Sequence, residues 1–305
     1  MIIFGILASF LQLALLIGIV VFIVRAVTGR KGEKSTEAAP VTVKRLLVFG
    51  SLYASLHVAA WGVAGLLALL SEDGRGERAS VPLAMTIVGV PILFVLGRWV
   101  LRSLSDADER GPAFSIYVNA ALVTAVAVIM ITAVLSGRWL VGEGEYSSMA
   151  LASLLVWTPI WFGHWSVWRT YRADVSNLHV FIGATAGLAT LAGFGAALLV
   201  EVFNRLLDSG TATDLAARSD SDVSTWVIGL AVGAMVFAWH WVITGMREAR
   251  DTLWHAYVAL VGVLGGLITA VIGAGIALFA VLQWWLGDPD SSSAVRHFAD
   301  FTPAL

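Results

Sequence analysis

The sequence predicts an all-α integral membrane protein with eight transmembrane helices, arranged as repeated helical hairpins with both termini on the non-cytoplasmic side. The first basis is composition: of 305 residues, 58% are hydrophobic and only 13% are charged, against about 45–50% and about 25% in an ordinary soluble domain. The second is distribution, because the charges fall in short clusters between long apolar runs. Each run has about the 20 residues that a helix needs to cross a hydrocarbon core of about 30 Å.

Eight such runs follow one another along the chain. We expect helices rather than strands, because an isolated segment in lipid must satisfy its backbone hydrogen bonds internally. The first run has no basic leader and no obvious small-residue cleavage site, so we interpret it as a retained helix. The runs are 3–26, 46–70, 82–101, 114–136, 149–168, 178–200, 224–246 and 255–286.

The basic residues indicate the orientation of these helices. With the amino terminus outside, thirteen of the 19 Lys and Arg residues fall on the cytoplasmic side. Cytoplasmic loops carry such an excess, so this orientation places both termini on the non-cytoplasmic side. The thirteen are Arg25, Arg30, Lys31, Lys34, Lys44, Arg45, Arg98, Arg102, Arg110, Arg169, Arg172, Arg247 and Arg250.

Two aromatic patterns indicate an internal repeat. Helices that run inward carry a basic residue followed by Trp near their cytoplasmic ends, and Trp99, Trp165 and Trp241 are 66 and 76 residues apart. Helices that run outward carry an aromatic residue near their starts, at Tyr53, Tyr117, Phe181 and Tyr257. These intervals predict hairpins at 45–110, 111–175 and 176–250, between a first helix and cytoplasmic linker (1–44) and a last helix and polar tail (251–305).

These tandem hairpins, with aromatic-rich starts and basic–Trp ends, resemble an uncharacterised prokaryotic multi-pass membrane family, known only as a domain of unknown function. The resemblance covers about residues 45–285. It implies helical hairpins in the cytoplasmic (inner) membrane of a prokaryote, and it brings no functional residues with it.

The candidate binding site is a layer of aromatic, His and Arg side chains near the cytoplasmic side. Polar groups within a membrane are expensive and tend to face an interior, so we expect this layer to carry function. Asn119, His179 and Tyr257 lie at the same level. The candidate ligand-binding residues are Tyr53, His57, Arg98, Trp99, Tyr117, His164, Trp165, His240, Trp241 and His255.

Three interpretations of this layer stay open. The first is an interfacial belt of Trp, Tyr and snorkelling Arg. The second is a cytoplasmic-side site for a lipid headgroup or anionic ligand. The third is b-type haem held by His164 and His240, which occupy equivalent repeat positions. We therefore expect a non-enzymatic scaffold or accessory subunit that binds lipid, a hydrophobic cofactor or partner helices. A haem-carrying electron-transfer subunit and an uncoupled channel or facilitator are the alternatives.

Several functional classes are disfavoured by composition. The chain has no cysteine and a net charge of −2, which argues against thiolate metal sites and nucleic-acid binding. No Asp, Glu or Lys lies in the middle of a run, whereas ion-coupled transporters use such groups. We expect neither a catalytic nor a metal site. Gly-x-x-x-Gly pairs at Gly183/Gly187, Gly229/Gly233 and Gly262/Gly266 predict close helix packing within the chain or self-association, alongside contacts with partner membrane subunits.

Overall fold

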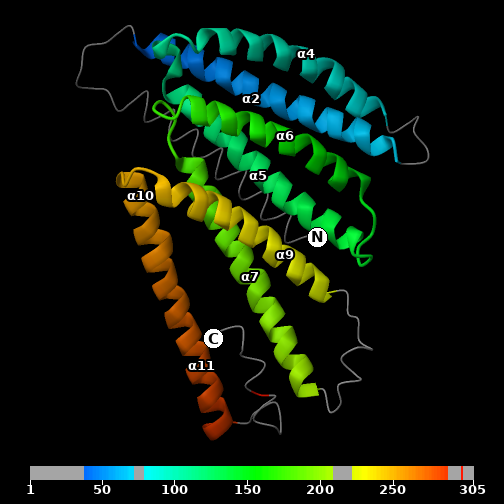
Figure 1. Cartoon of the computed structure of the whole chain (residues 1–305), viewed down its shortest axis with the longest axis vertical. Coiled ribbons are helices and arrows are strands. Elements are labelled where there is room, and N and C mark those ends of the chain that lie inside the picture. Colours follow the sequence, from blue (N-terminus) through cyan, green and yellow to red (C-terminus); the bar gives the residue numbers. More distant parts are fainter. Residues whose placement is uncertain (1–37, 72–78, 209–221, 288–296, 298–305) are drawn as a thin grey trace. The chain divides into compact units, whose positions relative to one another are not determined.

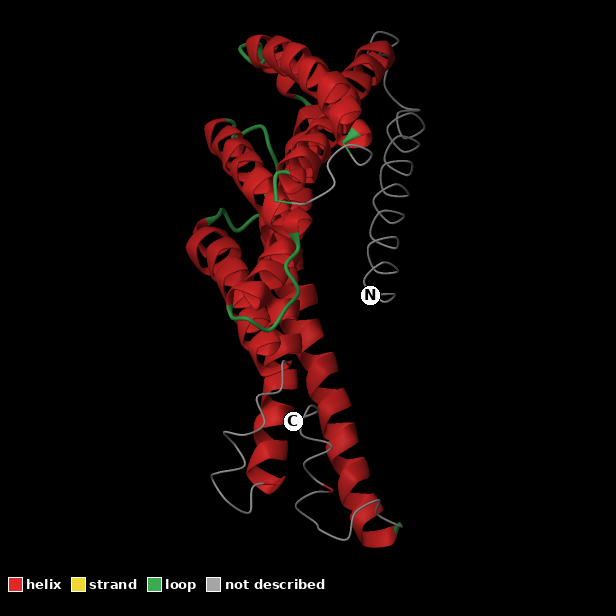
Figure 2. Ribbon diagram, turned by 90° about the vertical axis from the view of Figure 1, so that its right-hand side faces the viewer, coloured by secondary structure: helices red, strands yellow, loops and turns green. Residues whose placement is uncertain are grey.

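A computed structural model describes the chain except for residues 1–37, 72–78, 209–221, 288–296 and 298–305 (Figure 1). The elements within the described part are helices, joined by short turns and loops (Figure 2). The long α-helices are α2 (Ala38–Leu69), α4 (Ser80–Ser103), α5 (Pro112–Leu140), α6 (Ser148–Thr170), α7 (Leu178–Asp208), α9 (Asp222–Phe237) and α11 (Gly266–Leu286). The short elements are η1 (Ala107–Arg110), η2 (Ala238–Thr244), η3 (Gly245–Arg247), α10 (Thr252–Tyr257) and η4 (Val258–Gly265).

Two of the short elements are π-helices: η2, which continues α9, and η4, which joins α10 to α11. By its internal contacts the chain divides into two units, Met1–Phe49 and Gly50–Leu305. In the first unit the description begins within α2, so the predicted first helix at 3–26 lies outside the described residues. The second unit holds every predicted binding residue.

Six of the described helices, rather than the predicted eight, are long and apolar enough to cross a membrane. The prediction at 149–168 is right about the helix, since α6 covers it, but α6 is not among the six. Its four tryptophans, His164 and several Ser and Thr residues make it less apolar than its neighbours. The six spans are Val43–Leu69, Ser80–Ser103, Pro112–Leu140, Leu178–Val202, Val223–Arg247 and Thr252–Leu286.

Small residues let the first helices approach closely. A methyl group added at Gly62 of α2 would lie 2.7 Å from the Thr86 amide nitrogen of α4, and one at Gly89 of α4 would lie 2.6 Å from the Ala59 nitrogen of α2. On its other side, α2 packs through small residues against α5 and α6, where Trp157 is fully buried. Helices in lipid associate through such close backbone approach rather than through a hydrophobic driving force.

Helices α7 and α9 make the closest of the predicted Gly-x-x-x-Gly contacts. A methyl group at Gly187 of α7 would lie 2.5 Å from the Phe237 amide nitrogen, and one at Gly233 of α9 would lie 2.5 Å from the Leu191 nitrogen. The glycines at 183, 187, 229 and 233 therefore pack within the chain. Gly262 and Gly266 have open space where a side chain would lie, and self-association through this pair stays a prediction.

Two helices leave most of their apolar surface exposed. In α4 the buried residues are Gly89 and Val100, and in α11 they are Gly273 and Ala280. Large side chains such as Phe94 (66% exposed) and Val271 (63% exposed) lie mostly outside the protein interior. Apolar patches of this extent are typical of surfaces in contact with a membrane. The chain is a membrane protein, and the part of it that the structure describes is helical.

Candidate functional site

A cluster of indole and imidazole rings joins α6, α7 and η2. We call it the Trp–His cluster, and its members are Trp161, Trp165, Trp168, His179, Trp239 and His240. Trp165 is its centre: its ring contacts His179 at a centroid distance of 5.6 Å and His240 at 5.8 Å, both nearly perpendicular. His179 and His240 are each only 2% exposed. The cluster thus holds two imidazoles inside the helix bundle.

Asn119 of α5 fixes the orientation of His179. Its carbonyl oxygen accepts from the His179 backbone N–H at 2.7 Å and from the imidazole Nδ1 at 2.9 Å. Its amide nitrogen donates to the Ser115 carbonyl at 2.8 Å and to the Ser176 hydroxyl at 3.1 Å. A buried polar side chain that satisfies several groups at once locks its neighbours in one arrangement.

The backbone of its own helix fixes His240. The imidazole Nδ1 donates to the Val236 carbonyl at 2.9 Å, and the ring lies against Gly183 of α7, where a methyl group would be 2.5 Å from the His240 Cδ2. Glycine at position 183 is therefore required for this arrangement, because any side chain there would displace the imidazole.

His164 lies in a different contact, between α5 and α6. Its Nε2 pairs with the Tyr117 hydroxyl at 2.9 Å, and its Nδ1 pairs with the Ile160 carbonyl at 2.9 Å. Since Nδ1 donates to that carbonyl, Nε2 accepts from the Tyr117 O–H. Both ring nitrogens of His164 are thus engaged, while the haem alternative requires one of them for iron.

Replacing Tyr117 by Phe tests the strength of this contact. We expect a loss of stability of about 0.6 kcal/mol, the average for interhelical hydrogen bonds in membrane proteins. Thermal unfolding in detergent measures it. Tyr53→Phe is the matched control, since it removes the bond between the Tyr53 and Thr124 hydroxyls at 2.7 Å and should cost about as much. A loss above about 2 kcal/mol at Tyr117 alone would contradict a purely interhelical bond of this kind.

Tyr53 and His57 of α2 form a further ring contact, at a centroid distance of 4.2 Å. The His57 Nδ1 pairs with the Tyr53 carbonyl at 3.0 Å, and the ring lies edge-on to Trp157 at 5.2 Å. These two predicted residues therefore lie among α2, α5 and α6, apart from the contacts of His179 and His240.

Trp241 of η2 packs against α10, the helix that carries His255. The Trp241 ring contacts Tyr257 at 4.7 Å and Trp254 at 6.2 Å. His255 is exposed, and its Nδ1 pairs with the Asp251 carbonyl at 2.8 Å. Trp241 thus packs on α10, although the residue before it in the sequence, His240, packs on α7.

Arg98 and Trp99 lie at the surface of α4, with Trp99 46% accessible. The ten predicted residues are therefore distributed over several places: the Trp–His cluster, the Tyr117–His164 pair, the Tyr53–His57 pair, the surface of α10 and the surface of α4. Trp165 and His240 are the two that the structure brings together in the Trp–His cluster.

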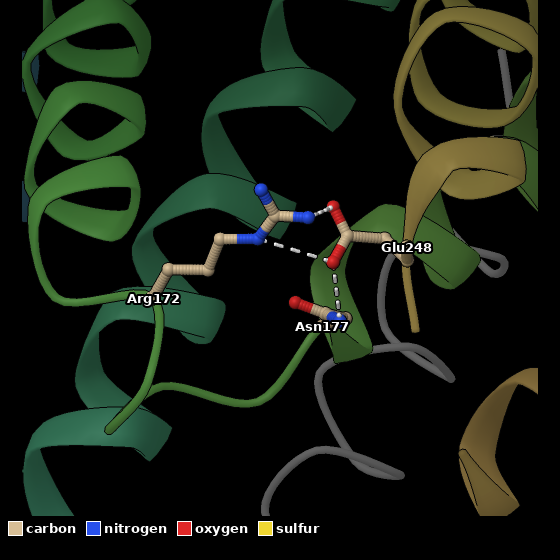
Figure 3. Close-up of polar contacts among 3 residues, drawn as sticks. All are labelled: Arg172, Asn177 and Glu248. Atoms are coloured by element: carbon tan, nitrogen blue, oxygen red, sulfur yellow. Dashed lines mark hydrogen bonds and ion pairs between the residues drawn. The ribbon is translucent and has the colours of Figure 1, made fainter. Parts of the chain in front are cut away.

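Figure 3 shows an ion pair between Arg172 and Glu248, which are not among the predicted binding residues. Glu248, whose side chain is 4% exposed, accepts from Arg172 through both carboxylate oxygens and from the Asn177 amide at 2.9 Å. The Arg172 guanidinium also lies 5.6 Å from the centre of the Trp168 ring. The sequence feature that points to Glu248 is its position between two arginines, Arg247 and Arg250.

Other residues of the candidate site that are missing from the prediction are His179, Asn119, Trp161, Trp168 and Trp239. The sequence places His179 and Asn119 in the same layer, but they are not among the predicted ligand-binding residues. Both are polar side chains in apolar runs at matched depth, and this feature points to them. Across the described ranges, no group of three or more His, Asp or Glu side chains is arranged to hold a metal ion.

Comparison with known proteins finds a family model that matches about two fifths of the chain. No curated protein and no solved structure matches the chain. The matching segment begins just before α7 and contains His179, His240 and both π-helices. The expected kinship with an uncharacterised family is confirmed for this segment: residues 177–301 match the model of the family described as "Domain of unknown function (DUF5671)".

Proposed function

We propose that the chain is a non-enzymatic membrane scaffold or accessory subunit whose outer surface binds lipid. The observation that carries the proposal is that buried polar side chains of the chain form hydrogen bonds between its helices. Tyr53, Tyr117 and Asn119 each bond across helices to a residue of another helix. These bonds fix the bundle, whereas the large apolar side chains of α4 and α11 face outward.

The end of α4 has the features of a lipid-headgroup contact. Arg98, Trp99 and Arg102 all lie at the surface in the last turns of this helix. Indole rings prefer the headgroup level, and basic side chains there are attracted to anionic lipids by about 1 kcal/mol each. This surface therefore suits an anionic phospholipid better than a zwitterionic one.

The test compares nanodiscs of phosphatidylglycerol with nanodiscs of phosphatidylcholine. The wild-type chain should unfold at a higher temperature in phosphatidylglycerol, and Arg98→Gln with Arg102→Gln should remove most of that difference, corresponding to about 2 kcal/mol for the pair. Thermal unfolding followed by intrinsic fluorescence measures both.

Arg110→Gln is the matched control. It removes the same charge, but the Arg110 guanidinium is already paired with Asp174 at 3.1 Å, so the lipid preference should persist. Equal loss in this control, or equal stability of the wild type in both lipids, would overturn the lipid proposal. A reducible Soret band in the purified protein would favour the haem alternative, and solute flux into liposomes would favour the channel.

A further inference from the structure

Two imidazole nitrogens in the Trp–His cluster have no hydrogen-bond partner within the part of the chain that the structure describes. They are the Nε2 atoms of His179 and His240, and both are fully buried. The indole nitrogens of Trp161 and Trp168 in the same cluster are also unpaired among the described residues. Buried polar groups are almost always hydrogen-bonded, so the cluster calls for an occupant.

The protonation of both rings follows from their partners. At His179 the Asn119 oxygen already accepts from the backbone N–H, and it also faces Nδ1, so Nδ1 carries the proton. At His240 the Val236 carbonyl can only accept, so Nδ1 again carries the proton. Each Nε2 is therefore unprotonated, and its lone pair is directed into the protein.

The two rings are neighbours. Both lie against Trp165, at 5.6 and 5.8 Å. The His240 ring covers Gly183, which follows His179 by one turn of α7. His240 also stands in a π-helix, a rare geometry that occurs frequently at functional sites.

These features match those of a metal ligand pair. Histidines that bind metals donate their other ring N–H to a carbonyl or carboxylate oxygen, which fixes the tautomer and directs the free nitrogen to the ion. Zinc requires four ligands, usually including thiolates or carboxylates, and the described cluster supplies two imidazoles. Trp165 contacts both rings, so a porphyrin bound between them would have to displace it.

We propose that His179 and His240 bind one copper(I) ion through their Nε2 atoms. Copper(I) is stable with two ligands, imidazole suits copper, and its single charge can be stabilised by surrounding indole rings. The proposal is independent of the lipid-binding surface. A water molecule that donates to both nitrogens is the alternative occupant.

The test uses the full, untagged chain in detergent, freed of metal and loaded anaerobically with copper(I). After desalting, we expect one copper per chain, and X-ray absorption should show two nitrogen ligands. His179→Asn and His240→Asn should each lower the retained copper at least tenfold. An asparagine amide replaces Nδ1 as donor but offers nothing at Nε2, so these variants keep the native hydrogen bonds.

His255→Asn is the matched control, because His255 makes the same Nδ1 contact to a carbonyl four residues earlier but is exposed; it should retain copper. Asn119→Ala, which removes the oxygen that positions His179, should raise the dissociation constant about 10- to 100-fold. Absence of copper in the wild type would leave water as the occupant and overturn the proposal, whether or not the variants fold. Unchanged loading in His179→Asn, or a four-coordinate zinc in preference to copper, would overturn it as well.

Discussion

Gly187→Ala is expected to destabilise the protein by about 1–3 kcal/mol, the cost of overpacking a close contact. The added methyl group would lie 2.5 Å from the backbone nitrogen of Phe237, and backbone cannot move aside as a flexible side chain can. Helices α7 and α9 would therefore have to separate along their whole contact. Thermal unfolding in detergent measures the loss, and Gly233→Ala on the facing helix should behave in the same way.

Gly193→Ala is the matched control on the same helix. Nothing lies within 4 Å of the position its methyl group would take, and alanine is the better helix former by about 1 kcal/mol. This variant should be neutral or slightly stabilising. Equal losses at 187 and 193 would show that the helix tolerates no alanine for reasons unrelated to the α7–α9 contact.

Arg172→Ala is expected to cost about 1–3 kcal/mol, because it leaves the buried Glu248 carboxylate with the Asn177 amide as its remaining side-chain donor among the described residues. Arg172 itself is 51% exposed, so the cost arises at the carboxylate rather than at the arginine. Arg172→Lys should recover part of the loss, since it restores the charge but not the two-point contact. Urea or thermal unfolding of the three proteins gives the comparison.

Arg110→Ala provides the control for this prediction. The Arg110–Asp174 pair also joins an arginine to a carboxylate, but its members are 24% and 32% exposed, and exposed pairs contribute about 0–1 kcal/mol. A loss at Arg110 as large as that at Arg172 would show that burial of Glu248 is not what makes its contact costly to break.

The helices were predictable because an isolated apolar run in lipid must satisfy its backbone hydrogen bonds internally, as a helix does. The expected boundaries at 82–101 and 178–200 lie within α4 and α7 as the structure has them. The spans were overcounted because α6 is a helix of the right length with too polar a sequence. The tryptophans of α6 face other helices, so α6 is buried by neighbouring parts of the protein. The hydropathy of a sequence does not report such contacts between helices.

The site was predicted less well than the fold. Placing Tyr53, Tyr117, His164 and His240 near the same level of the bundle does not determine which helix each side chain faces. That depends on helix rotation, and rotation is set by close contacts such as His240 against Gly183. Asn119 and His179 are 60 residues apart, so only the packing of α5 beside α7 brings them together. Sidedness and the internal repeat remain predictions.

Helix α6 has a consequence for how the protein is made. It is a poor candidate for partitioning into lipid alone, yet Trp157 and Trp168 are among the most buried side chains of the chain. Insertion of a segment depends on its own apolarity when it leaves the translocon singly. We therefore expect the nascent segment to enter the bilayer alongside α5, which precedes it and packs against it, and not to be released into the lipid singly.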